Sequence, residues 1–202
     1  MNLRVLFAIS MAVLCTTAVF AQNPVTADSP FQVKYASNVG PTSPSDSDSV
    51  FNLTNTGATG GNICVNVYTF SPDEQLISCC SCVVTPNALV SLSAKSDLIN
   101  NTLTPAVPSS IVVKLVSTAG GACNAATPGA LATGLAAWGT TIHAGSGGSW
   151  ATTETAFTPA TLSAAEYTRI TSLCGFIQSN GSGYGICNSC RSGGLGASKK
   201  KL

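Results

Sequence analysis

The chain has 202 residues, only 8% of them are charged, and its formal net charge is +1. Loss of an expected signal peptide that contains Arg4 would leave 8 basic and 8 acidic residues. Because this small number of basic residues cannot neutralise a run of phosphates, we expect no nucleic-acid partner. A neutral surface also gives little repulsion between copies, which is compatible with self-association or embedding in a matrix.

The first 21 residues are expected to be a secretory signal peptide. Arg4 provides a positive start, an apolar run from Val5 to Val19 follows, and Ala21 ends a small-residue cleavage site. The run is shorter than the roughly 20 residues that span a bilayer, and no later stretch is long and apolar enough. We therefore expect a secreted protein, extracellular, periplasmic or at the cell surface, without an integral membrane segment after signal removal.

Alternating apolar and polar residues predict strands in the first half of the mature chain. In 31–37, Phe31, Val33 and Tyr35 share one face, which indicates a half-buried strand. Residues 62–70 are apolar on both faces, so this strand is expected to be central and covered on both sides. Further strands are expected at 49–55, 75–84, 88–95 and 109–118, with a polar loop at 40–49 and a turn at 71–74.

The second half begins with a stretch rich in Gly, Ala and Thr, after which the spacing of apolar residues changes to that of a helix. Residues 134–144 are compatible with a strand, 145–149 with a flexible loop, and 150–158 with a strand that ends before Pro159. A helix is expected at about 164–179. Ser163 and Glu166 form a capping box before it, and Asn180-Gly181 is a stop signal after it.

These elements predict a mainly β protein, an antiparallel β-sandwich with one C-terminal α-helix. We expect the sandwich domain, including the helix, to occupy residues 22–181. A glycine-rich, cysteine-containing tail is expected at 182–202.

Cysteine is the most informative residue type in this chain. Of 9 cysteines, Cys15 lies in the expected signal peptide. An even number in an exported chain favours disulfides, and eight cysteines allow 105 connectivities. We therefore expect a disulfide-stapled fold that uses Cys64, Cys79, Cys80, Cys82, Cys123, Cys174, Cys187 and Cys190.

The hairpin register suggests one of the pairings. Folding the chain about residues 72–74 places Cys64 opposite Cys82, or near Cys80 if the register slips, so a bridge from Cys64 to one of them is expected. Strand alternation puts Cys80 and Cys82 on one face and Cys79 on the other. The remaining triplet cysteines are expected to reach Cys123, Cys174 or the tail.

The Cys187-x-x-Cys190 pair suggests an alternative function, a thiol redox or thiolate-metal protein. Zinc would need a second pair, and Cys80-x-Cys82 lacks standard knuckle spacing. Redox motifs of this kind usually precede a helix, whereas glycines and Arg191 surround this one. We expect a short-range structural bridge at this pair, and no metal or cofactor.

Other catalytic signals are weak. His143 is the only histidine and has no acid nearby in the sequence, and the chain has no Gly-x-Ser-x-Gly elbow, so we expect no catalytic residues. Trp138 and Trp150 flank a glycine-rich stretch, where they would pack in the core, form a lid or stack on sugar rings. A carbohydrate-binding module is therefore a further alternative.

Two long strings, ICVNVYTFSPDEQLISCCSC at 63–82 and GICNSCRSGGLG at 185–196, carry a resemblance. They resemble a group of uncharacterised secreted proteins of soil bacteria, and the likeness covers most of the mature chain. The resemblance implies no activity and supplies no catalytic residues. We therefore expect a non-catalytic structural or binding protein of the cell surface or extracellular matrix. Its expected partner is an unidentified protein, a glycan surface or a second copy of itself.

Overall fold

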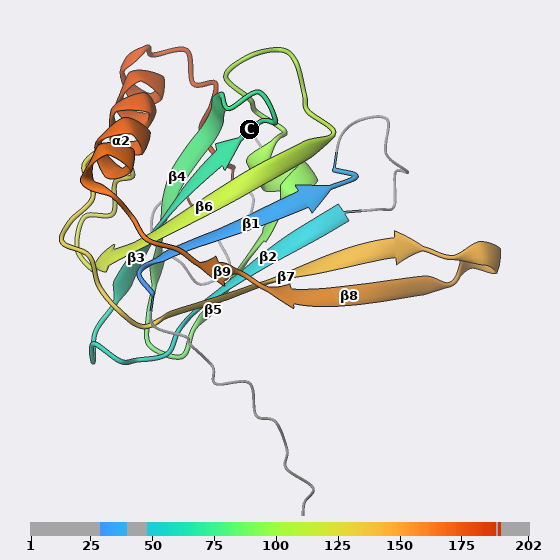
Figure 1. The fold of residues 1–202 in the computed structure, drawn as a ribbon, viewed down its shortest axis with the longest axis horizontal. Helices are drawn as coiled ribbons and strands as arrows, with labels where there is room; N and C mark the ends of the chain where they lie inside the picture. The colour runs from blue at the N-terminus through green and yellow to red at the C-terminus, as the bar shows by residue number, and fades with distance from the viewer. Residues whose placement is uncertain (1–28, 40–47, 189, 191–202) are drawn as a thin grey trace, which may run out of the picture.

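The computed structural model describes residues 29–39, 48–188 and 190. The expected signal peptide, most of the 40–49 loop and the end of the tail lie outside these residues. The described chain forms two β-sheets, in which every pair of neighbouring strands is antiparallel (Figure 1). The first sheet runs in the order β4 (Leu76–Val84), β3 (Ile63–Phe70), β6 (Ser110–Ala119), β1 (Phe31–Ser37) and β9 (Thr158–Pro159). The second runs in the order β5 (Leu89–Ser93), β2 (Asp48–Asn55), β7 (Leu135–Ala144) and β8 (Trp150–Ala156). The predicted antiparallel sandwich is confirmed.

The main core lies between the two sheets. Every residue of β3 is buried, as its two apolar faces predict, because β4 and β6 flank it and both of its faces are covered. Phe51 of β2 is fully buried in this core. Its ring meets Phe157 edge-on, with 5.8 Å between centroids, at the point where the chain crosses from β8 to β9.

A second core lies beneath the C-terminal helix α2 (Ala164–Ser179), whose bounds match the prediction. The Ser163 hydroxyl accepts from the Glu166 N–H, so one half of the expected capping box forms. Ile170, Cys174 and Ile177 face the sheet, and their buried neighbours include Tyr68 of β3. The Tyr68 hydroxyl donates to the Ala125 carbonyl at 2.7 Å, and burial raises the pKa of this phenol above its ordinary value.

An ion pair ties the start of α2 to the same sheet. Lys114 of β6 pairs with Glu166, and its Nζ lies 4.6 Å from the centre of the Phe70 ring. The guanidinium carbon of Arg169 lies 5.9 Å from the centre of the same ring. The helix thus has a polar contact at its N-terminal end in addition to its apolar face.

The half-buried strand expected at 31–37 forms as β1, and the end of another strand was predicted wrongly. In β1, the apolar residue Tyr35 is 62% exposed, whereas the polar residue Gln32 is buried. Gln32 can be buried because its side-chain amide reaches across the sandwich and donates to the Leu135 carbonyl at 2.9 Å. The strand expected at 88–95 ends at Ser93, where the helical turn η1 (Ala94–Leu98) begins. The Ser93 hydroxyl accepts from the Ser96 N–H and so caps that turn.

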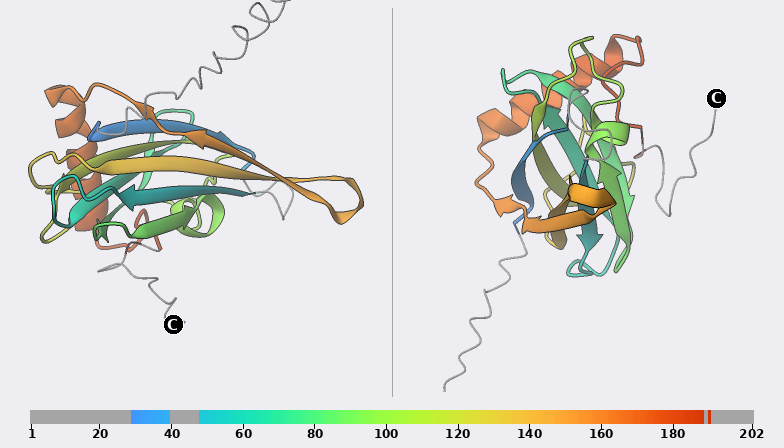
Figure 2. Two further views of the ribbon diagram at one scale, coloured as in Figure 1. Left: turned by 90° about the horizontal axis from the view of Figure 1, so that it is seen from below. Right: turned by 90° about the vertical axis from the view of Figure 1, so that its right-hand side faces the viewer.

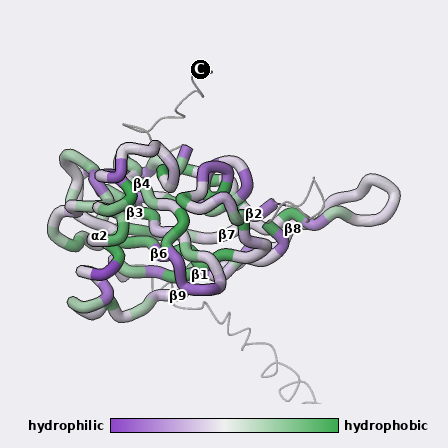
Figure 3. The backbone as a smooth tube through the Cα atoms, turned by 90° about the horizontal axis from the view of Figure 1, so that it is seen from above, coloured by the Kyte–Doolittle hydropathy of each residue, from purple (hydrophilic) through white to green (hydrophobic). Residues whose placement is uncertain are grey.

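The β7–β8 hairpin extends past the ends of the other strands, away from α2 (Figures 1 and 2). Residues 145–149 connect its strands through the short turn η2 (Ser146–Gly148). Every residue of β8 is exposed. The far end of the hairpin is pale in the hydropathy view, which agrees with its content of Gly, Ser and Thr (Figure 3). No helix in residues 29–39, 48–188 and 190 combines the length and apolar character needed to cross a bilayer.

Candidate functional site

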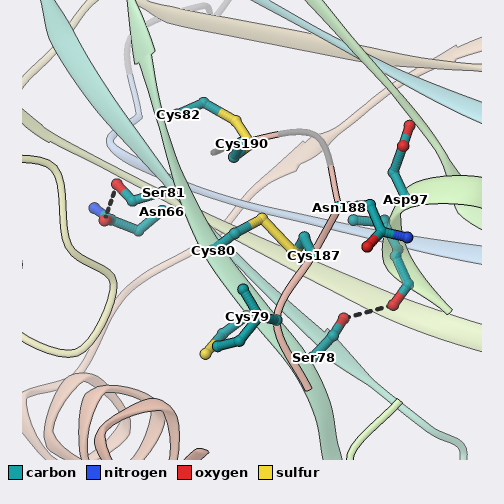
Figure 4. Close-up of a disulfide and its surroundings, with 12 residues drawn as sticks. Asn66, Ser78, Cys79, Cys80, Ser81, Cys82, Asp97, Cys187, Asn188 and Cys190 are labelled. Atoms are coloured by element: carbon teal, nitrogen blue, oxygen red, sulfur yellow. Dashed lines mark hydrogen bonds between the residues drawn. A yellow bond between two sulfur atoms is a disulfide. The ribbon is translucent and has the colours of Figure 1, made fainter. Parts of the chain in front are cut away.

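All eight cysteines after Cys15 form disulfides. The four pairs are Cys64–Cys123, Cys79–Cys174, Cys80–Cys187 and Cys82–Cys190. Three of these bonds start from β4 and end on α2 or on the segment that follows it. Figure 4 shows the two that join Cys80 to Cys187 and Cys82 to Cys190. Within the part of the chain that the structure describes, no cluster of three or more His, Cys, Asp or Glu side chains is arranged to hold a metal.

The expected bridge from Cys64 to Cys82 or Cys80 is wrong. A register shift between Thr69 and Phe70, next to the turn, places Cys64 opposite Val83. One extra residue in a strand reverses the face that every later side chain takes. Cys64 therefore shares a face with Cys79, and Cys80 and Cys82 point into the core between the sheets. Its partner is Cys123, at a Cα–Cα distance of 5.4 Å.

The predicted division of the triplet is confirmed. Cys79 lies on the face covered by α2 and bonds to Cys174, at a Cα–Cα distance of 5.9 Å. Cys80 and Cys82 lie on the opposite face and reach the tail. The expected bridge between Cys187 and Cys190 is wrong, because each bonds to β4 and neither bonds to the other.

Backbone hydrogen bonds also hold the tail beside β4. The Cys79 N–H donates to the Gly185 carbonyl at 2.8 Å, and the Cys187 N–H donates to the Cys79 carbonyl at 3.3 Å. Gly185 has a φ of 79°, and a Cβ there would lie 2.8 Å from Ile177 Cγ2, so only glycine fits. Asn101 extends this contact by donating to the Gly183 and Ile186 carbonyls. The tail thus occupies the middle of the outer edge of β4, at Cys79.

The two tryptophans lie on one surface, the outer face of the second sheet. Trp138 is opposite Ala156, and Ala144 is opposite Trp150, so alternation places all four on the same side. The inner side of this sheet carries Phe51 and Leu53, which are fully buried in the core. Trp150 is 53% exposed and Trp138 is half-buried. Neither tryptophan belongs to the sandwich core, so the core-packing alternative is wrong.

A row of polar side chains crosses this outer face from strand to strand. Ser91 of β5 donates to Asn52 Oδ1 at 2.7 Å, and Asn52 Nδ2 donates to Thr140 Oγ1 at 3.1 Å. Thr140 in turn donates to Glu154 Oε1 of β8 at 3.2 Å. We call these four side chains the polar row. Sequence reasoning missed it because its members come together only through the register of β5, β2, β7 and β8.

His143 and Lys34 lie on the other side of the hairpin. His143 Nε2 is 3.3 Å from Thr153 Oγ1, and both residues are on the side opposite the tryptophans. The Lys34 ammonium of β1 donates to Thr155 Oγ1, and its stem covers Gly139. Burial lowers the pKa of Lys34 below its ordinary value. Neither contact joins these bases to a carboxylate.

No family model and no curated protein matches the chain. A solved structure titled "Crystal Structure of Thermotoga maritima 1070" is similar to it, with a TM-score of 0.41 and 12% sequence identity. The match covers 66% of this chain and 94% of that one.

Proposed function

We propose that this is a secreted, non-catalytic structural or binding protein that acts at the cell surface or in the extracellular matrix. The disulfide arrangement is the observation that carries the proposal. Every cysteine after Cys15 is consumed in a cross-link, and three of the cross-links fasten the end of the described chain to one strand. Such cross-links persist in oxidising compartments and stabilise a fold outside the cell.

The thiol alternative finds less support in this arrangement. A redox pair requires Cys187 and Cys190 to form and break a disulfide with each other. A thiolate-metal site requires both cysteines to be free of disulfides. Each is instead bonded to a cysteine of β4, and Cys187 is buried. Export through the expected signal peptide at residues 1–21 agrees with the same reading of the cysteines.

Intact mass spectrometry of the natively produced protein tests this proposal. A thiol-blocking reagent applied without reduction should add no mass, and reduction in denaturant should allow eight labels. Peptide mapping should recover the Cys79–Cys174 pair, and the mature N-terminus should follow Ala21. Reactive thiols in the untreated protein, or a bound metal, would contradict the structural role and favour the thiol alternative.

A second candidate function, carbohydrate binding, is favoured by the outer face of the second sheet. Trp138 and Trp150 share that face with the hydroxyl, amide and carboxylate groups of the polar row. Aromatic faces cover the apolar side of a sugar ring, and such polar groups bond its hydroxyls. A neutral polysaccharide would need no charge on the protein.

Replacing Trp150 with alanine is expected to weaken binding to a neutral polysaccharide by about tenfold or more, because it removes the most exposed stacking surface on that face. Affinity electrophoresis or titration of intrinsic fluorescence across a glycan panel measures the effect. Tyr35→Ala is the matched control, since Tyr35 is 62% exposed and belongs to the other sheet. Equal affinity of both variants for every glycan would remove this candidate.

A further inference from the structure

The free edge of β8 differs from the other sheet edges in the described residues. The tail occupies the middle of the β4 edge, β9 has two residues and includes Pro159, and β5 has five residues. Proteins protect exposed edges by such covering, shortness, proline or lysine. β8 has seven exposed residues, no proline, no lysine and a single charge, Glu154. Its three threonines and Trp150 favour the extended conformation.

Two hydrogen bonds establish which backbone groups this edge presents. The Gly145 N–H donates to the Ser149 carbonyl at 2.8 Å, and the Phe157 N–H donates to the Ala137 carbonyl at 3.0 Å. Hydrogen-bonded pairs alternate with non-bonded pairs along an antiparallel ladder. The odd-numbered residues of β8 therefore bond to β7. The N–H and C=O groups of Trp150, Thr152, Glu154 and Ala156 point away from β7 toward the free edge.

The geometry points to a second copy of this chain as the partner of this edge, paired antiparallel through β8 about a twofold axis at Thr153. This register sets Trp150 opposite Ala156 of the other copy and Thr152 opposite its Glu154. Every outward-pointing residue is then used, and about eight backbone hydrogen bonds form. The two second sheets would join into one continuous sheet, in the manner of β-strand addition.

Charge and side-chain size both favour this register. A shift that centres the twofold axis on Glu154 would set the two Glu154 carboxylates against each other, which like charges oppose. In the proposed register each Glu154 meets a neutral threonine. The exposed Trp150 indole would lie over Ala156 of the second copy, a small residue whose β7 neighbour is Trp138. Apolar surface of Trp150 would thereby leave water.

The position of the hairpin makes the edge reachable. β7 and β8 extend past the ends of the other strands, and no other described strand pairs with the free edge of β8 (Figures 1 and 2). The near-zero charge expected for the mature chain adds little repulsion between copies. This inference rests on the proposed structural or binding role and names its partner.

Sedimentation velocity of the oxidised mature protein over a wide concentration range tests the pairing, with substitutions at Thr152. Thr152→Glu should raise the dimer dissociation constant by about tenfold, because it sets a carboxylate against Glu154 of the other copy at two symmetric places. Thr152→Lys should lower that constant, because it sets an ammonium there instead. Thr152→Ala is the matched control and should leave the dimer nearly unchanged, since the backbone groups remain.

Thr152→Pro tests the backbone bonds themselves. It removes an N–H that points to the free edge and is not used by β7, so it should abolish the dimer while the thermal midpoint of the dilute monomer changes little. A wild-type protein that stays monomeric, or a dimer that all four variants leave intact, would overturn the pairing. Either result would leave the proposed function to be judged by its own mass-spectrometric test.

Discussion

Removing the Cys79–Cys174 disulfide with paired alanines is expected to lower the free energy of unfolding by about 4 kcal/mol. The two cysteines are fully buried and lie 95 residues apart, so the bond closes a long loop and greatly restricts the unfolded chain. The thermal midpoint should fall by about 10 °C for a chain of this length. Urea unfolding followed by circular dichroism measures the change.

Hydrogen exchange adds a local readout for the same variant. Cys174 is one of three buried residues that α2 sets against the first sheet, so helix amides should exchange much faster without the bond. The matched control removes Cys64–Cys123, which spans 59 residues and does not involve α2. That variant should lose similar stability and keep slow exchange in the helix after allowance for the global change. Unchanged exchange in α2 after loss of Cys79–Cys174 would show that the apolar contacts alone hold the helix.

Phe51→Ala is expected to cost about 3 to 5 kcal/mol of stability, because it leaves a large cavity between the sheets. Phe51 has no exposed surface, and its ring contacts Phe157 at the crossing between β8 and β9. Phe176→Ala is the matched control, since that ring on α2 is 60% exposed and its loss should cost less than about 0.5 kcal/mol. Urea denaturation of both variants gives the comparison.

A double-mutant cycle isolates the contact between the two rings. Phe51→Ala and Phe157→Ala should cost less together than the sum of their separate effects, by about 0.5 to 1.5 kcal/mol. The coupling matters for the hairpin, because Phe157 anchors the end of β8 to the core. Strict additivity would mean that the edge-to-face contact at 5.8 Å contributes nothing beyond separate burial of the rings.

Short-range sequence signals correctly predicted the helix α2 and the central strand β3. The Ser163 cap and the Asn180-Gly181 stop are short-range signals, and α2 begins and ends where they place it. The apolar character of 62–70 on both faces predicted a strand covered on both sides, and β3 is buried throughout. Both predictions succeed because each depends on residues within a few positions of one another.

The sequence did not predict as well which side chains are buried or which residues of different strands share a sheet face. Gln32 is polar but buried, because its amide finds a carbonyl acceptor on the other sheet. The tryptophan face and the polar row needed the register of four strands drawn from widely separated segments. No pattern within a single strand states which strand lies beside it.

For the cysteines, the sequence predicted which face of the strand each triplet residue takes, but not which partner each one bonds. By itself the sequence determined that the triplet divides between two faces, because alternation along a strand has a period of two. Only the tertiary structure decided the partners, because a register shift between Thr69 and Phe70 moved Cys64 to the face of Cys79. It also set the tail beside β4, where Cys187 and Cys190 bond to the strand and not to each other. Pairing over about 100 residues depends on how sheet, helix and tail pack together, and that packing is a property of the whole chain.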